Sequence, residues 1–219
     1  MSAARRSVFD RELRELDETI FKLASMVDEA IDKAMVSLYS RDLQLARDVV
    51  AGDEEVNQLR YRVEESALRV LATQQPMAGD LRRIIAVIHI AVELERMGDH
   101  AADIASLAER LIDEGDFDTL HKLPKMAKRA RKMLSSAVEA FGQSDAEAAY
   151  SLIAKDEKID RHYYQLRQEV FDEMRDAEYI RRASFLLWVG HDLERIGDRV
   201  TNIAERIIFM ATGEFVESG

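Results

Sequence analysis

The chain of 219 residues contains no cysteine, only 2 prolines and 9 glycines. The missing cysteines exclude disulfide bonds and thiolate metal sites, and they fit a reducing compartment. Scarce proline and glycine, with apolar residues at 47%, favour a packed all-helical protein. The sequence also lacks any run of the roughly 20 apolar residues that a membrane span needs. Residues 1–17 do not resemble a secretion signal, so we expect a cytoplasmic protein.

Charge and missing motifs exclude further classes of function. The net charge of −11 argues against general binding of nucleic acid. The sequence has no glycine-rich phosphate loop, no Gly-x-Ser-x-Gly motif and no Cys/His pair. We therefore expect a protein without enzymatic turnover. Trp188 and the methionines are expected to pack in the core.

Apolar residues at helical spacing predict six helices. The first should end near Ser40, and Asp42 should cap the second. The second must end before Pro76, because proline cannot continue a helix. Pro124 suits the first turn of the fourth helix. The predicted helices cover residues 7–40, 43–73, 78–114, 124–142, 145–175 and 180–212.

The second half of the chain repeats the first. Residues 42–57 match 145–160 at an offset of 103, and residues 93–105 match 192–204 at an offset of 99. In the second of these matches, 7 of 13 positions are identical. We therefore predict an all-α fold of two tandem three-helix bundles, residues 1–115 and 118–219, related by an approximate internal two-fold axis.

Acidic and amide residues recur at four-residue spacing in both halves, which places them on one side of each helix. A pair in the second helix of each half should face a ladder in the third, at a similar distance from the connecting loop. Facing oxygen ligands suit a hard cation such as iron, zinc, manganese or magnesium, without choosing among them. The candidate ligands are Asp53, Asn57, Glu95, Asp99 and Asp103, and Asp156, Asp160, Glu194, Asp198 and Asn202.

A solvated helix face explains a single ladder well, since exposed like charges cost only a few tenths of a kcal/mol. An exposed, charged side borders each ladder, with Arg96 and His100 in one half and Arg195 and Arg199 in the other. Three observations favour metal: the ladder occurs twice, each copy holds a mid-helix glycine, and the second helix of each half brings a further pair at four-residue spacing. Such a glycine costs about 1 kcal/mol, which indicates a close backbone neighbour. The two glycines are Gly98 and Gly197.

These motifs resemble the PhoU family of bacterial phosphate-uptake regulators. The resemblance rests on Gln75-Pro76-Met77-Ala78 and on the motif Leu-Glu-Arg-hydrophobic-Gly-Asp, which occurs at 94–99 and again at 193–198. It implies that four residue pairs surround metal ions, with Asn57 departing from the acidic residue of the family pattern. The pairs are Asp53/Asn57, Glu95/Asp99, Asp156/Asp160 and Glu194/Asp198.

The resemblance also implies a negative regulator that acts between the ATPase of the phosphate-specific ABC transporter and a phosphate-responsive histidine kinase. Such an adaptor would reach the membrane only through its partners and would bind no nucleic acid. We expect a homodimer. Two alternatives stay open: a carboxylate-bridged metalloenzyme, which would turn over a substrate, and a metal-free helical scaffold.

Overall fold

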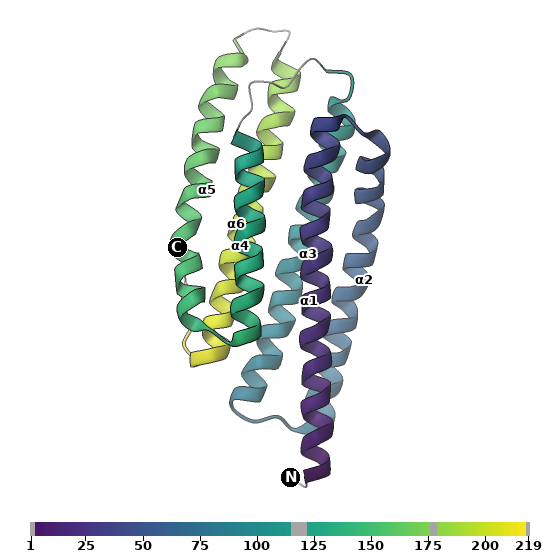
Figure 1. Cartoon of the computed structure of the whole chain (residues 1–219), viewed down its shortest axis with the longest axis vertical. Coiled ribbons are helices and arrows are strands. Elements are labelled where there is room, and N and C mark those ends of the chain that lie inside the picture. The colour runs from purple at the N-terminus through teal and green to yellow at the C-terminus, as the bar shows by residue number, and fades with distance from the viewer. Residues whose placement is uncertain (1–2, 115–121, 176–178, 218–219) are drawn as a thin grey trace.

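The computed structural model describes residues 3–114, 122–175 and 179–217; the side chains of residues 3–6, 155–158 and 173 are outside this description. Within these ranges the chain forms helices and no strand, which confirms the all-α prediction. Consecutive helices run in opposite directions (Figure 1). The helices are α1 (Ala3–Ser40), α2 (Leu43–Gln74), α3 (Gly79–Leu111), α4 (Lys122–Gln143), α5 (Ala146–Glu173) and α6 (Ile180–Thr212).

Local sequence sets the helix ends much as predicted. The Asp42 side chain accepts a hydrogen bond from the Leu45 backbone N–H at 3.0 Å, and Asp145 caps α5 through Ala148 at the same distance. Each aspartate satisfies a backbone donor that the first turn leaves unpaired. The largest differences are at the start of α1, which begins at Ala3, four residues before the predicted start, and at the end of α3, which ends at Leu111, three residues before the predicted end. The predicted boundary between the two halves lies outside the described residues.

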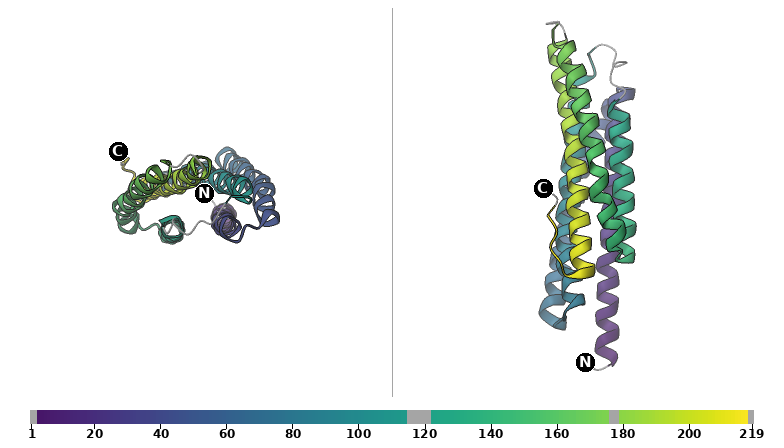
Figure 2. Two further views of the ribbon diagram at one scale, coloured as in Figure 1. Left: turned by 90° about the horizontal axis from the view of Figure 1, so that it is seen from above. Right: turned by 90° about the vertical axis from the view of Figure 1, so that its left-hand side faces the viewer.

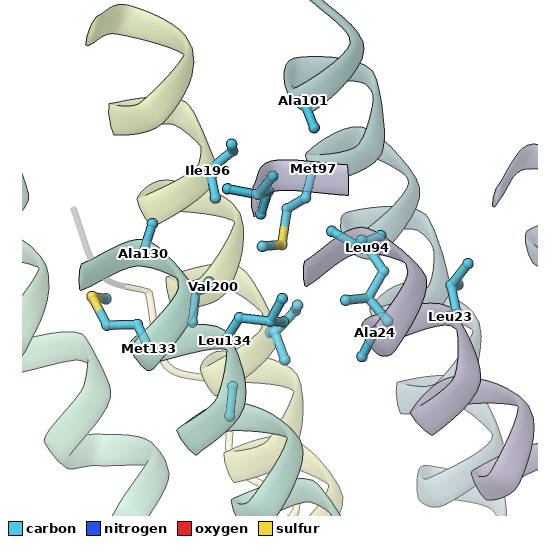
Figure 3. Close-up of a cluster of buried hydrophobic side chains, with 14 of the residues drawn as sticks. Leu23, Ala24, Leu94, Met97, Ala101, Ala130, Met133, Leu134, Ile196 and Val200 are labelled. Carbon is cyan, nitrogen blue, oxygen red and sulfur yellow. The ribbon is translucent and has the colours of Figure 1, made fainter. Parts of the chain in front are cut away.

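Two three-helix bundles form, α1 to α3 and α4 to α6, and α3 packs along α6 to join them. Figures 1 and 2 agree in placing α1 and α4 on the same face of the molecule. Buried side chains form one continuous core through both bundles. Figure 3 shows part of this core, where Met97 and Ala101 of α3 gather with Ile196 and Val200 of α6. These residues occupy equivalent positions of the repeat, so the joining surface is itself repeated.

The core prediction is wrong for two large side chains. Trp188 is 58% exposed and Met77 is 79% exposed. Helix α6 buries Leu186 and Val189, so the intervening position 188 is turned away from the core. Met77 lies in the short connection between α2 and α3. Other methionines are buried as predicted, among them Met97, Met126 and Met133.

Gly98 lies where helices α2 and α3 approach closely. A Cβ atom at this position would be 3.1 Å from Cγ1 of Val56 and 3.3 Å from Oδ1 of Asp53. The predicted close neighbour therefore exists, but it consists of α2 side chains and not of backbone. The missing Cβ lets the Asp53 carboxylate reach the surface of α3.

Gly190 of α6 has an even closer neighbour, which the sequence did not indicate. A Cβ there would overlap Cδ2 of Leu166, a fully buried side chain of α5. We expect Gly190→Ala to lower the free energy of unfolding by about 1–3 kcal/mol, because overpacking outweighs the gain in helix propensity. Urea unfolding measures this change. Gly52→Ala is the control: no atom lies within 4 Å of its Cβ, so it should stabilise α2 by roughly 0.5–1 kcal/mol.

Candidate metal sites

In the first bundle, Asp53 of α2 faces the acidic ladder of α3. We call Asp53, Asn57, Glu95, Asp99 and Asp103 the first carboxylate cluster. The Asn57 amide donates a hydrogen bond to Oδ2 of Asp53 at 3.0 Å. The other oxygen, Oδ1, is buried and accepts no hydrogen bond from the described residues. A buried carboxylate oxygen without a donor is costly, and a cation would satisfy it.

One guanidinium group offsets part of this negative charge. Arg60 of α2 places Nε 3.4 Å from Oε1 of Glu95, while its Nη1 donates to Glu64 at 2.7 Å. Both side chains of the Arg60–Glu95 pair are largely buried, with exposed fractions of 13% and 19%. The positive charge therefore lies at one end of the cluster, beside Glu95. Oδ1 of Asp53 gains no hydrogen bond from it.

Four carboxyl groups of the first cluster, those of Asp53, Glu95, Asp99 and Asp103, have a pKa above the ordinary value. Burial is the largest cause for each of them. For Asp53 and Glu95 the charge of Asp99 is the next cause, and for Asp103 it is the charge of Asp192 on α6. Burial also raises the pKa of Asp99, although neighbouring cationic groups oppose it. The cluster therefore holds like charges that repel one another, and a bound cation would relieve this repulsion.

The second bundle repeats the arrangement between α5 and α6. Asp160, Glu194 and Asp198 each present a carboxylate oxygen, and these oxygens lie within 4.8 Å of one another. We call these three residues the second carboxylate cluster. Arg195 donates to Asp198 at 2.8 Å. The side chain of Asp156, the remaining predicted ligand of α5, is outside the described residues. Three predicted ligands from two helices thus lie close enough together that small side-chain rotations would let all three contact one cation.

The last residue of each ladder lies at the contact between the two bundles. In α6, Asn202 donates its amide to Oε2 of Glu93 on α3 at 3.0 Å, and Arg199 donates to the same oxygen at 3.2 Å. Arg199 and Glu93 are mostly buried, with 14% and 13% exposed. The Asn202 amide, predicted as a metal ligand, is thus engaged with the neighbouring bundle.

The reciprocal contact joins Asp192 of α6 to α3. Nδ1 of His100 lies 3.1 Å from Oδ1 of Asp192, and Asp103 belongs to the same group within 4.8 Å. At the offset of 99, Asp192 is the equivalent of Glu93, and His100 is the equivalent of Arg199. Each bundle thus extends one acidic side chain to the other, as in an isologous contact. This reciprocity is the relation expected of an approximate internal two-fold axis.

These contacts correct one part of the sequence interpretation. His100 and Arg199 were expected on the exposed side of the ladders, yet their side chains are only 24% and 14% exposed. Arg96 and Arg195 do lie there, with 52% and 40% exposed. Sequence reasoning also missed Glu93, Asp192 and the role of His100. The available signal was the acidic residue before each Leu-Glu-Arg motif, at positions 93 and 192, but it does not reveal the partner.

The raised pKa values predict how the metal-free protein responds to pH. A folded-state pKa above the unfolded value gives stability that is present at low pH and is lost as pH rises through the folded pKa. Asp53, whose ordinary pKa is 3.8, should therefore destabilise the metal-free fold near neutral pH. We expect Asp53→Asn to raise the free energy of unfolding by roughly 0.5–1 kcal/mol near pH 7, discounted for solvent screening.

Chelator-treated protein, unfolded in urea at several pH values, provides the measurement. The gain should vanish below about pH 4, where both proteins carry a neutral group at this position. With metal present, the order should reverse, because the variant lacks a ligand. A gain that is independent of pH would contradict this electrostatic explanation.

Within the described ranges, no helix combines the length and the apolar character needed to cross a membrane. The fold and the two clusters define a class of protein: a tandem pair of three-helix bundles with facing carboxylates in each repeat. The sequence model of the PhoU domain matches twice, at residues 20–108 and 123–207. The chain therefore belongs to the PhoU family, as the resemblance indicated.

Known relatives agree over nearly the whole chain. A protein of Streptococcus pneumoniae, named phosphate-specific transport system accessory protein PhoU homolog, is 36% identical over 97% of this chain and 99% of its own length. A protein of the same name from Aquifex aeolicus is 36% identical and covers 94% of each chain.

Two solved structures share the fold. The crystal structure of the phosphate transport system regulatory protein PhoU from Streptococcus pneumoniae matches with a TM-score of 0.90 and 35% identity, over 95% of this chain and 99% of that one. The crystal structure of PhoU from Pseudomonas aeruginosa matches with a TM-score of 0.89 and 32% identity, over 94% of this chain and 100% of that one. Both likenesses therefore extend through the two bundles.

Proposed function

We propose that this chain is a metal-binding accessory regulator of phosphate uptake. The names of its relatives, which refer to phosphate-specific transport, support the transport context. The observation that carries the metal assignment is the convergence of Asp160, Glu194 and Asp198 within 4.8 Å. The buried, unbonded Oδ1 of Asp53 supports a second site in the other bundle. Carboxylate and amide oxygens fit iron, manganese, magnesium or zinc.

In this proposal, each site binds metal between the second and third helices of its bundle. Asp53, Asn57, Glu95 and Asp99 would hold one ion or cluster, and Asp156, Asp160, Glu194 and Asp198 the other. A bound cation would neutralise the repelling carboxylates and crosslink the two helices. Asp103 and Asn202 would contribute less, since both lie at the contact between α3 and α6.

We further propose a cytoplasmic homodimer that works by binding and has no turnover of its own. It would dock on the ATPase of the phosphate transporter and on a phosphate-responsive histidine kinase, and would repress phosphate signalling. Exposed Arg96 and Arg195 flank the two clusters. A metal ion there could accept a ligand from the partner, so that the cluster would be part of the docking surface.

A pull-down against the cytoplasmic region of the kinase and against the transporter ATPase tests this role. We expect chelator to weaken binding, and we expect a variant lacking Glu95, Asp99, Glu194 and Asp198 to bind poorly while keeping its helicity. Chelator-insensitive binding by the folded variant would show that the metal only stiffens the bundles. If neither partner is bound under any condition, the regulatory proposal is wrong. Turnover of an added substrate by the metal-loaded protein would favour the enzyme alternative.

A further inference from the structure

Helix α4 is strongly basic in an acidic protein. It carries six basic residues and one acidic residue, whereas the whole chain has a net charge of −11. Two of the basic side chains are paired: Lys122 lies 3.3 Å from Glu169, and Arg131 bonds Asp28 of α1 at 2.8 Å. No described acidic side chain forms an ion pair with the other four, which are Lys125, Lys128, Arg129 and Lys132.

A groove runs between α4 and α1, on the face where these helices lie side by side (Figure 1). Its volume is about 910 Å³. The α1 side presents Val36 and Tyr39, which are 47% and 42% exposed, beside the buried Met35. On α4, Lys128 and Lys132 line the groove together with Ala127. The groove thus combines exposed apolar side chains with one cationic edge.

The two edges of the groove differ in charge. On the α1 edge, Asp28 and Asp32 are both paired with Arg131, whose single positive charge offsets one of their two negative charges. On the α4 edge, Lys128 and Lys132 have no such partner among the described residues. An occupant would therefore need negative charge on one flank only, beside α4, and an apolar face toward Val36 and Tyr39.

We propose that this groove docks an acidic amphipathic helix of a partner protein. A helix satisfies its own backbone hydrogen bonds, and an amphipathic helix that lays its apolar face into an apolar groove is a recurring mode of recognition. A membrane surface carries suitable charge, but it is too flat to fill a groove between two helices. The proposal concerns a surface formed by α1 and α4 and does not depend on metal in the carboxylate clusters.

A synthetic helical peptide serves as the probe for the full-length protein. It carries leucine at positions i, i+3, i+4 and i+7 and glutamate along one flank; matched peptides carry glutamine or lysine instead. Fluorescence anisotropy measures binding. We expect the glutamate peptide to bind about tenfold more tightly than the glutamine peptide, with an advantage that shrinks as salt increases.

Three double variants separate the contributions. Lys128→Glu with Lys132→Glu should weaken binding of the glutamate peptide about tenfold or more. Val36→Ser with Tyr39→Ser should weaken the glutamate and glutamine peptides alike, because it removes apolar contacts. The control makes the same charge change on exposed side chains of α2, outside the groove, and should change affinity by less than about twofold. The control variant is Arg62→Glu with Arg69→Glu.

Several results would overturn the proposal. Equal affinity for the glutamate and lysine peptides would show that charge does not select the occupant. If the α2 control variant loses as much affinity as the Lys128 and Lys132 variant, then the peptide does not bind in this groove. Binding to phosphatidylglycerol vesicles that depends on Lys128 and Lys132, without binding of the peptide, would identify a membrane surface instead. If the protein is a dimer and the double variant Lys128→Glu with Lys132→Glu is a monomer, then the occupant of the groove is a second copy of this chain. Circular dichroism confirms that each variant remains helical.

Discussion

Asp99→Asn combined with Asp198→Asn should remove most of the bound metal from the protein. Each substitution replaces a charged ligand with a neutral amide, at the centre of one ladder. We expect each single variant to lose metal at its own site only, with affinity there reduced by about 100-fold or more, which exceeds the effect typical of a residue that merely supports a ligand. Elemental analysis after reconstitution and gel filtration provides the stoichiometry. The two sites are in different bundles, so their losses should add.

The matched control replaces exposed carboxylates outside both clusters, Glu18→Gln with Asp113→Asn. It removes the same total charge and should leave the stoichiometry unchanged. Metal binding by the parent protein should weaken at acid pH, because protons compete for the ligands. The raised pKa of Asp53 and Glu95 means that this competition begins at a higher pH than for free carboxyl groups. Unchanged metal content in the double variant would contradict the assignment.

Glu93→Ala should cause a large loss of stability, about 3 kcal/mol. The substitution leaves the guanidinium of Arg199 at the contact between the bundles without its carboxylate, and an unpaired buried charge is strongly unfavourable. It also removes the acceptor of the Asn202 amide. For a chain of this length, the melting temperature should fall by roughly 6–12 °C. Thermal unfolding followed by circular dichroism measures the change.

A surface pair provides the control for this prediction. Arg47 and Glu109 are 2.9 Å apart, but 57% and 41% of their side chains are exposed. Glu109→Ala should therefore cost less than about 1 kcal/mol. Combining Glu93→Ala with Arg199→Ala should restore part of the lost stability, because it removes the stranded charge. If Glu93→Ala and Glu109→Ala have the same effect, then the contact between the bundles is not an important electrostatic link.

The sequence alone determined the helices, their caps and the repeat. Apolar spacing, the capping residue Asp42 and the helix-ending effect of Pro76 all act within a few residues, so they can be recognised without a structure. The facing of Asp53 toward the α3 ladder could also be predicted, because a short connection makes α2 and α3 antiparallel neighbours. Duplication of the ladder then indicated one candidate metal site in each half.

Only the tertiary structure decided how the two bundles meet. Glu93 contacts Arg199 and Asn202, more than 100 residues away in sequence, and nothing local to Glu93 identifies those partners. The overlap that forbids a Cβ at Gly190, and the outward position of Trp188, depend on how far α6 is rotated about its axis. Helical periodicity defines a face only to within tens of degrees, whereas close packing and ion pairing depend on fractions of an ångström. For that physical reason, the contact between the bundles and the groove between α1 and α4 could not be predicted from the sequence.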